Sequence, residues 1–410
     1  MPYIQRAITP ILKQRVSTSK CMLLVGARQV GKSTLIKHEF KDFNRANFDD
    51  RLTRMQAKEE PKLFLLNNPQ PLFIDEVQKE SSILEDIKQI VDESDERGMF
   101  LLSGSQKLEL MKGMSESLAG RVSISELTGL SMREIYGVKF NRHFIPTDAY
   151  IKEREKEIVK YDNIWEIIHK GSYPELYDID RDWQEYYSSY VATYLERDIN
   201  ELVAADGITF TKFLTAVAAR TGELLNYSNI AGDVGVSEPT IKNWISILER
   251  TGIVYLLQPY SASALKRAIK TPKLYFRDTG LACYLTRWLT ADTLKCSAVA
   301  GNMFETFVVS EILKSYSNEG KDYRFNIFYY RGKDRNASGE NEIDLVIEED
   351  GVLYPVEIKM SGNPKASMGA MNQVLDKVSD KKRGLGVILC LIDKKTYLKE
   401  NLVALPIEFI

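Results

Sequence analysis

The feature that most constrains this chain is a glycine-containing loop that lies between an apolar run and a helical pattern. The loop reads Gly26-Ala27-Arg28-Gln29-Val30-Gly31-Lys32-Ser33. It follows the apolar residues 22–25 and precedes the helical pattern of residues 34–40. It matches the motif G-x-x-x-x-G-K-[ST] without a mismatch, in the strand–loop–helix context that the motif requires. The sequence therefore predicts a P-loop.

The chemistry of a P-loop indicates its ligand. Gly26 and Gly31 let the loop curl, so that backbone N–H groups and the following helix N-terminus face phosphate groups and stabilise their charge. We expect Lys32 to reach the β and γ phosphates and Ser33 to supply a hydroxyl to Mg²⁺, which takes few protein ligands. The expected cofactors are ATP and Mg²⁺. The residues expected to hold them are Gly26, Ala27, Arg28, Gln29, Val30, Gly31, Lys32, Ser33, Thr34 and Asp75.

Two carboxylates end the apolar strand pattern of residues 71–74, as in a Walker B motif. Asp75 is expected to bind Mg²⁺, and Glu76 is expected to polarise the attacking water. The pair predicts ATP hydrolysis in addition to binding.

Two further residues are predicted to act in catalysis. Ser105 follows the next strand, where a γ-phosphate sensor would lie. Arg121 either completes a neighbouring subunit's site as an arginine finger or pairs with a surface carboxylate.

The order of apolar runs predicts the fold class. At 410 residues the chain is long enough for several domains. In its first third, short apolar runs alternate with helical patterns, which is typical of a parallel α/β sheet. The runs are residues 21–25, 46–48, 72–74, 100–102 and 122–127. Residues 151–220 then favour helices, and residues 271–410 return to mixed strands and helices.

The middle of the chain has helix-turn-helix spacing. Within residues 227–249, the apolar side chains of Ile230, Ala231, Val234 and Val236 are expected to pack one short helix. Gly235 is expected to make the turn, and residues 239–248 a second helix that carries Lys242 and Asn243. A hairpin within residues 252–260 is expected to form a wing. Two interpretations stand: the second helix lies in the DNA major groove, or the module packs against protein.

Carboxylates and a lysine on two apolar strands predict a second site. Asp344 lies in the strand pattern of residues 343–347, and Glu357 and Lys359 end the next strand. Alternation places Glu357 and Lys359 on one face, where they would converge with Asp344 around a divalent cation. The pattern resembles the D-x(n)-E-x-K signature of restriction-endonuclease-like nucleases. Asp344 and Glu357 would then bind Mg²⁺ and Lys359 would activate water. The alternative is an amphipathic hairpin whose charges face solvent.

Motifs along nearly the whole chain resemble one family. They are GARQVGKST, LFIDEVQ, LLSGSQ, ESLAGR, GSYPEL, YLERDI, KLYFRDTGL and the pair EIDLVI and YPVEIK. Together they resemble microbial AAA-type ATP-binding proteins with a C-terminal domain of unknown function, family 4143. The resemblance implies that Glu305 is a further metal ligand. It also implies an α/β chain with four parts: an AAA-like ATPase domain (1–140), a helical subdomain (141–222), a winged helix-turn-helix (223–270) and a restriction-endonuclease-like domain (271–410).

Composition limits the partners. The formal net charge of -2 gives no overall attraction to nucleic acid, so DNA binding would need a local patch. The four cysteines and three histidines are dispersed, which argues against a zinc or redox motif. The apolar runs are shorter than the ~20 residues that span a bilayer, so we expect a cytoplasmic protein without membrane contact. The expected partners are ATP, DNA as a candidate, and a second copy of the chain if Arg121 acts in trans.

Overall fold

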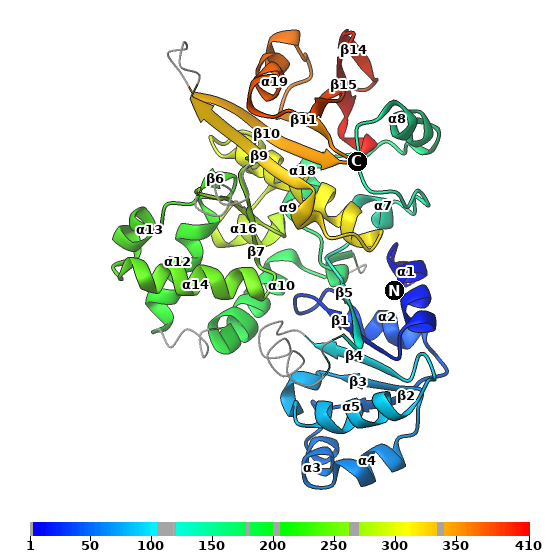
Figure 1. The fold of residues 1–410 in the computed structure, drawn as a ribbon. Coiled ribbons are helices and arrows are strands. Elements are labelled where there is room, and N and C mark those ends of the chain that lie inside the picture. The colour runs from blue at the N-terminus through cyan, green and yellow to red at the C-terminus, as the bar shows by residue number, and fades with distance from the viewer. Residues whose placement is uncertain are drawn as a thin grey trace.

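The computed structural model describes residues 3–104, 118, 120–177, 181–199, 206–261, 270–333 and 340–410. Figure 1 shows the N-terminal sheet at the bottom, the C-terminal sheet at the top, and helices coloured from teal to yellow between and beside them. Among the described residues, no helix combines the length and the apolar character needed to cross a bilayer.

The N-terminal part is a parallel sheet with the strand order β2-β3-β4-β1-β5. Its strands are β1 (Cys21–Val25), β2 (Asn44–Asn47), β3 (Leu72–Asp75), β4 (Phe100–Gly104) and β5 (Val122–Glu126). Its helices are α1 (Thr9–Thr18), α2 (Lys32–Glu39), α3 (Arg51–Glu59), α4 (Pro61–Asn67) and α5 (Ile83–Glu93). The predicted α/β class and its parallel N-terminal sheet are confirmed.

Successive side chains of β1 pack in two different cores, which explains how this sheet joins the rest of the molecule. Cys21, Leu23 and Val25 belong to a core that the described parts of the sheet share with α3, α4 and α5. Met22 and Leu24 belong to a larger core, which continues into the helical region and the C-terminal sheet. Because successive side chains of a strand point to opposite faces, one face of the sheet packs on α3, α4 and α5, and the other packs on α1, α2 and the remainder of the chain.

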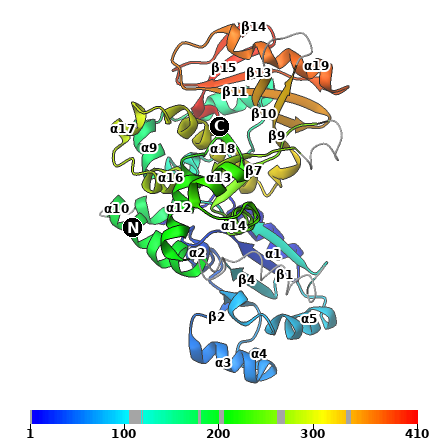
Figure 2. The same ribbon diagram turned by 90° about the vertical axis from the view of Figure 1, so that its left-hand side faces the viewer.

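The helical region links the two sheets. Its helices are α7 (Met132–Ile135), α8 (Asp148–Arg154), α9 (Ile164–Lys170), α10 (Trp183–Tyr190), the π-helix η4 (Val191–Ile199), α16 (Thr279–Leu285), α17 (Ala291–Lys295) and α18 (Ala300–Asn318). Helix α18 is buried over most of its length. In Figures 1 and 2 it lies between the C-terminal sheet and the N-terminal domain, which explains why its polar residues as well as its apolar ones are enclosed.

A small module lies between η4 and α16 along the chain. It contains α12 (Gly207–Ala218), α13 (Tyr227–Val234) and α14 (Glu238–Arg250). Its sheet has the order β6-β8-β7, with β6 (Glu223–Leu224), β7 (Val254–Leu257) and β8 (Lys273–Phe276). The expected hairpin within residues 252–260 is wrong, because β7 pairs with the distant β8. Strand β8 thus lies beyond the expected boundary at residue 270 but belongs to this sheet.

The C-terminal sheet is mixed, with the order β14-β15-β13-β11-β10-β9 and β12 beside β11. Its strands are β9 (Ile327–Lys333), β10 (Glu340–Glu349), β11 (Val352–Lys359), β12 (Lys382–Arg383), β13 (Gly386–Cys390), β14 (Thr396–Lys399) and β15 (Leu402–Pro406), and α19 (Leu375–Val378) precedes β12. Strands β10 and β11 form a hairpin around Gly351, which has φ of 75°. This hairpin carries Asp344, Glu357 and Lys359.

Candidate functional site

The P-loop leaves the carboxyl end of β1 and enters α2, which begins at Lys32. Gly31 has φ of 93°, in the left-handed region that favours glycine. At Gly26 there is no room for a side chain, because a Cβ atom would lie 2.3 Å from the carbonyl oxygen of Leu127. The loop is therefore packed against the segment that follows β5, and both glycines have a steric reason to be there.

Lys32 turns its ammonium group into the loop. Its Nζ donates to the carbonyl oxygens of Gly26 at 3.0 Å and Ala27 at 2.9 Å. Burial lowers the pKa of Lys32 to about 8, although the negative charges of Glu76 and Asp75 oppose the shift. The ammonium therefore lies inside the loop that would surround the phosphates.

The carboxylates stand at the same edge of the sheet as the P-loop. Strand β4 lies between β3 and β1, and its Ser103 is the register partner of Leu24 in β1. Ser103 Oγ donates a hydrogen bond to Asp75 Oδ1, and both side chains are buried. Glu76 has a left-handed backbone with φ of 54°, and its carboxylate accepts from Gln78 Nε2. The structure thus places Asp75 and Glu76 at the edge of the sheet from which the P-loop leaves, with Lys32 inside the loop.

Arg6 is a contact of the P-loop that sequence reasoning missed. Its guanidinium donates to the carbonyl oxygen of Val30 at 2.8 Å and to that of Thr128 at 2.7 Å. Its Nε contacts Glu134 Oε1 at 3.0 Å, and both side chains are almost fully buried. Arg6 therefore ties the loop to the segment after β5. A lone arginine near the N-terminus gives no sequence signal for this role, because its partners lie far along the chain.

The other predicted ATPase residues are less closely gathered. Ser105 lies outside the described residues. Arg121 forms an ion pair with Asp92 of α5, and both side chains are exposed. The guanidinium carbon of Arg28 lies 5.0 Å from the centre of the Tyr194 ring in η4. The structure thus gives Arg121 a partner within its own domain and directs Arg28 to the helical region.

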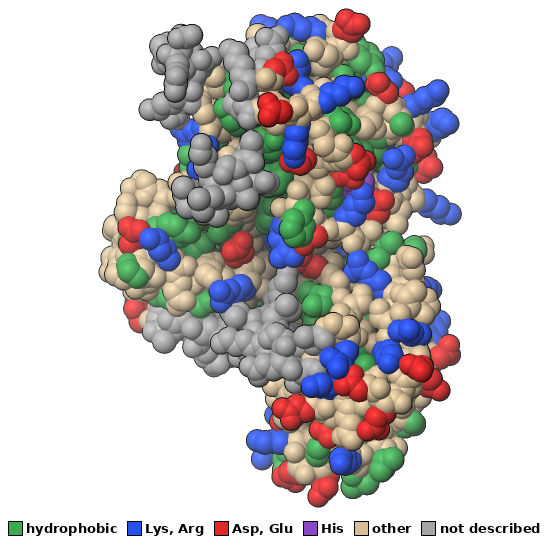
Figure 3. Space-filling model, in the orientation of Figure 1, with side chains coloured by type: hydrophobic (Ala, Val, Ile, Leu, Met, Phe, Trp, Pro, Cys, Tyr) green, Lys and Arg blue, Asp and Glu red, His purple; other side chains and the backbone are tan. Residues whose placement is uncertain are grey.

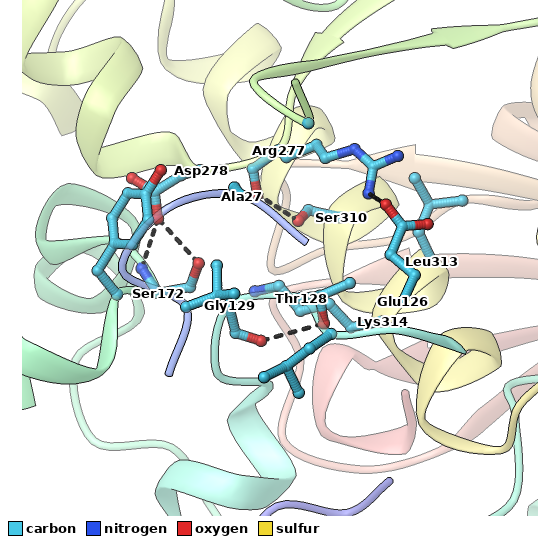
Figure 4. Close-up of a pocket in the computed structure, with 14 residues that line it drawn as sticks. Ala27, Glu126, Thr128, Gly129, Ser172, Arg277, Asp278, Ser310, Leu313 and Lys314 are labelled. Atoms are coloured by element: carbon cyan, nitrogen blue, oxygen red, sulfur yellow. Dashed lines mark hydrogen bonds and ion pairs between the residues drawn. The ribbon is translucent and has the colours of Figure 1, made fainter. Parts of the chain in front are cut away.

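A small cavity of about 40 Å³ marks where the P-loop meets the other parts of the chain. Figure 4 shows its lining, to which the P-loop contributes Ala27, the segment after β5 contributes Thr128 and Gly129, and the remainder of the chain contributes Arg277, Ser310 and Lys314. Two ion pairs frame the junction. Arg277 Nη1 contacts Glu126 Oε1 at 2.9 Å, and Lys314 Nζ contacts Glu311 Oε1 at 2.7 Å. Glu126 ends β5, beside Val25 of β1, which immediately precedes the P-loop.

Helix α18 also holds the chain that leaves the N-terminal sheet. Glu311 Oε2 accepts from the backbone N–H of Met132 at 2.8 Å, and Lys314 Nζ donates to the carbonyl oxygen of Leu130 at 3.0 Å. All these atoms are buried. The helix that leads into the C-terminal sheet is therefore fixed directly to the exit of the P-loop domain.

The C-terminal hairpin brings Asp344, Glu357 and Lys359 together. Lys359 Nζ lies 2.8 Å from Asp344 Oδ2 and 2.9 Å from Glu357 Oε2. Burial, and then the charge of Asp344, raise the pKa of Glu357 to about 8. Within the described ranges, no three Asp, Glu, His or Cys side chains form a ready-made metal site. Nevertheless, Glu357 Oε1 is buried and accepts no hydrogen bond from the described residues, as suits an oxygen that can accept a cation.

Glu305 approaches this site from α18. Its Oε1 accepts from Tyr275 at 2.6 Å and lies 3.2 Å from Lys273 Nζ. Burial and the charge of Asp344 raise the pKa of Glu305, and Lys273 opposes that shift. Sequence reasoning predicted Glu305 but missed Lys273 and Tyr275, which come from β8.

The face of α14 proposed to read DNA has mixed charge. Lys242 is exposed but forms an ion pair with Glu238 at 2.7 Å, and Asn243 beside it is exposed. On the face drawn in Figure 3, basic and acidic side chains are interspersed over the visible surface. Lys270 is exposed beyond the module, whereas residues 262–269 lie outside the described ranges. The described surface has no dominant basic stripe in this view.

Comparison with known proteins divides the chain into three parts. Residues 18–136 match the AAA domain, residues 161–292 a domain of unknown function (DUF8612), and residues 300–410 a domain of unknown function (DUF4143). The AAA match assigns the P-loop part to a family of nucleotide-binding ATPase domains.

Two mycobacterial proteins and two solved structures are similar to this chain. Uncharacterized proteins of Mycobacterium bovis and Mycobacterium tuberculosis are each 27% identical over 375 residues, which is 89% of this chain and 76% of theirs. A chain of the Drosophila ORC structure bound to DNA has 13% identity and a TM-score of 0.22, covering 68% of this chain and 85% of its own. A Vibrio cholerae protein has 11% identity and a TM-score of 0.19, covering 94% of each chain. Neither TM-score supports a shared overall fold.

Proposed function

We propose that this chain, which belongs to the AAA-domain proteins with a C-terminal DUF4143 domain, hydrolyses ATP in order to control that C-terminal domain. The observation that carries the proposal is the convergence of Lys32, Asp75 and Glu76 at one edge of the parallel sheet. A P-loop alone would support binding. The two carboxylates beside it supply a metal contact and a water-orienting group, which are the parts that hydrolysis requires.

Each residue has a defined role in this proposal. The backbone N–H groups of residues 26–33 and the ammonium of Lys32 bind the phosphates, whose charge replaces the contacts that Lys32 makes within the loop. Ser33 and Asp75 would hold Mg²⁺, and this ion would neutralise charge that develops on the phosphates. Ser103 orients Asp75 by hydrogen bonding. Glu76 accepts a hydrogen bond from the attacking water and aligns it.

Replacing Lys32 tests this half of the proposal. Lys32→Ala should abolish measurable ATP hydrolysis and weaken nucleotide binding at least tenfold. Lys37→Ala, which alters an exposed lysine on the same helix, is the matched control and should leave both unchanged. Hydrolysis by Lys32→Ala at the wild-type rate would remove the P-loop from the mechanism.

Control of the C-terminal domain is proposed from the junction. Glu126 lies beside the strand that leads into the P-loop, and it contacts Arg277, which follows β8 directly. Glu311 and Lys314 of α18 hold the segment that leaves β5. A change in the P-loop on binding or release of phosphate could therefore reach the elements around the second carboxylate site in two ways. One is through Glu126 and Arg277, and the other is through Glu311 and Lys314.

For the output we propose metal-dependent cleavage of nucleic acid at Asp344, Glu357 and Lys359. The carrying observation is the buried Glu357 oxygen without a donor. Asp344, Glu357 and Glu305 would hold Mg²⁺, which would supply a bound water of lowered pKa. Lys359 orients or activates the attacking water.

Purified protein should cleave at least one of single-stranded, duplex or branched DNA, or RNA, with ATP and Mg²⁺ or Mn²⁺. Asp344→Ala and Lys359→Ala should abolish cleavage, and intact nucleic acid in every case would refute this half.

A second candidate is an ATP-dependent switch without nuclease activity. It is favoured by the position of Lys359, whose ammonium is shared by both carboxylates where a cation would bind. In this case ATP would reorient the α12–α14 module, which we propose is a winged helix, so that it binds DNA or protein. Slow turnover with ATP-dependent capture of a partner would favour the switch, and rapid DNA-stimulated turnover would exclude it.

Arg121 extends the proposal to the assembly. As an arginine finger it would have to leave Asp92 and reach a neighbouring subunit, which requires a dimer or a ring. Size measured with and without ATP tests this role. A strictly monomeric protein that hydrolyses ATP normally excludes an essential role of Arg121 in trans.

A further inference from the structure

Two side chains of β8 contact the C-terminal carboxylate site from outside the C-terminal domain. Lys273 and Tyr275 are two residues apart on this strand, so they share one face of the β6-β8-β7 sheet. Both reach Glu305 of α18, with Tyr275 Oη at 2.6 Å and Lys273 Nζ at 3.2 Å. The module that precedes the C-terminal domain thus supplies two of the groups that fix a proposed metal ligand.

Both contacts end on the same oxygen of Glu305. They hold Oε1, which leaves Oε2 to serve as a ligand. A carboxylate with one oxygen fixed by a phenol and an ammonium has lost most of its freedom to rotate. Its second oxygen therefore has a set direction before any cation arrives.

Lys273 also connects the two elements that carry the acidic residues. Its Nζ lies 2.5 Å from Glu342 Oε1, and Glu342 is two residues before Asp344 in β10. The lysine side chain is only 4% exposed, so it is committed to these carboxylates. A buried ammonium needs such partners, because its charge is poorly compensated without them. Lys273 consequently links α18 to β10.

We propose that Lys273 and Tyr275 are positioning residues of the C-terminal carboxylate site, which is therefore shared between two modules of the chain. This inference rests on the proposed metal-binding role of Asp344, Glu357 and Glu305. Residues that orient metal ligands commonly change metal affinity 10- to 100-fold when they are removed. Lys273 and Tyr275 have the geometry of such residues, since each contacts a proposed ligand and bridges it to a separate element.

Mn²⁺ binding to the full chain without nucleotide tests the proposal. Wild type and Asp344→Asn are each titrated with Mn²⁺ by calorimetry. The binding that Asp344→Asn loses relative to wild type is the binding at this site. We expect Tyr275→Phe to weaken that binding about tenfold and Lys273→Met to weaken it more. Lys273→Arg, which keeps the charge, should retain more binding than Lys273→Met. The matched control is Tyr260→Phe, since Tyr260 is a buried tyrosine whose hydroxyl contacts Ser379 and not Glu305.

The possible results separate this inference from the proposed function. If wild type binds Mn²⁺ through Asp344 and Tyr275→Phe binds it equally well, the positioning role is wrong and the metal site stands. If Asp344→Asn binds as wild type does, both proposals fail, because there is no such site to position. Thermal unfolding of each variant identifies loss of fold. Should Lys273→Met unfold, Tyr275→Phe decides the question, because it removes one oxygen and preserves the ring.

Discussion

Arg6 donates a hydrogen bond from Nη1 to the carbonyl oxygen of Val30 at 2.8 Å, so a residue outside the AAA-family match holds the middle of the P-loop. The same guanidinium is paired with Glu134 in a buried environment. A segment that precedes the sheet therefore contacts the P-loop backbone directly.

Replacing Arg6 should affect both stability and nucleotide binding. Arg6→Gln leaves Glu134 buried with less compensation, and breaking a buried ion pair costs about 3–5 kcal/mol. We expect a loss of that order in the free energy of unfolding, measured with urea, and weaker binding of a fluorescent ATP analogue. Arg142→Gln is the control, because it breaks an exposed pair with Glu153 that is worth at most about 1 kcal/mol. Equal stability of the two variants would contradict the role of Arg6.

Glu76→Gln should separate binding of ATP from its hydrolysis. The amide keeps the size of the side chain and its contact with Gln78, but it no longer aligns water as a carboxylate does. We expect hydrolysis to fall by roughly 10² or more while the Kd for ATP changes little. Glu85→Gln, an exposed change on α5, should behave as wild type. A steady-state rate close to wild type in Glu76→Gln would assign water activation to another group.

ATP binding should weaken as the pH rises through about 8. Burial lowers the pKa of Lys32 to about 8, so the side chain is charged below that pH and neutral above it in the free protein. Phosphate binding favours the charged form, and binding above pH 8 must therefore take up a proton. The Kd should rise by at most about tenfold per pH unit above 8. Calorimetry at pH 9 in two buffers of different ionisation enthalpy measures the uptake directly, and zero uptake would contradict this assignment.

The lowered pKa of Lys32 affects folding stability in the opposite direction: stability should increase as the pH rises. An unfolded chain keeps Lys32 protonated up to its ordinary pKa of 10.5, whereas the folded chain releases the proton near 8. Between these values the unfolded state binds more protons, so the Lys32 contribution makes folding more favourable as the pH rises. A loss of ATP affinity in this range therefore cannot be attributed to unfolding caused by Lys32.

Residues in local motifs could be predicted from the sequence. Residues whose role depends on partners far along the chain could not. The P-loop, Asp75, Glu76, and the alternation of Glu357 with Lys359 follow from short stretches of sequence. Arg6 and Lys273 could not be found this way, because each takes its meaning from partners on distant segments. The wing was misplaced for the same reason: a local hairpin was expected after residue 252, whereas β7 pairs with a strand that begins at Lys273.

Arg277 should transmit the nucleotide state to α18. It contacts Glu126 at 2.9 Å and Tyr323 at 2.6 Å, and Ser310 of α18 donates to its carbonyl oxygen at 2.8 Å. We expect a non-hydrolysable ATP analogue with Mg²⁺ to change hydrogen exchange in peptides covering residues 300–318. In Arg277→Gln this change should shrink or disappear while the analogue still binds, because Arg277 is proposed to couple the two sites and not to hold the phosphates.

Arg324→Gln is the matched control for this experiment, because Arg324 is an exposed arginine paired with Asp322 next to the same Tyr323. It should preserve the response of residues 300–318. A wild-type response in Arg277→Gln would assign the coupling to other contacts between the P-loop domain and α18, such as those of Glu311 and Lys314. If the analogue bound to wild type without any change in those peptides, nucleotide control through this helix would be wrong, even with ATP hydrolysis intact.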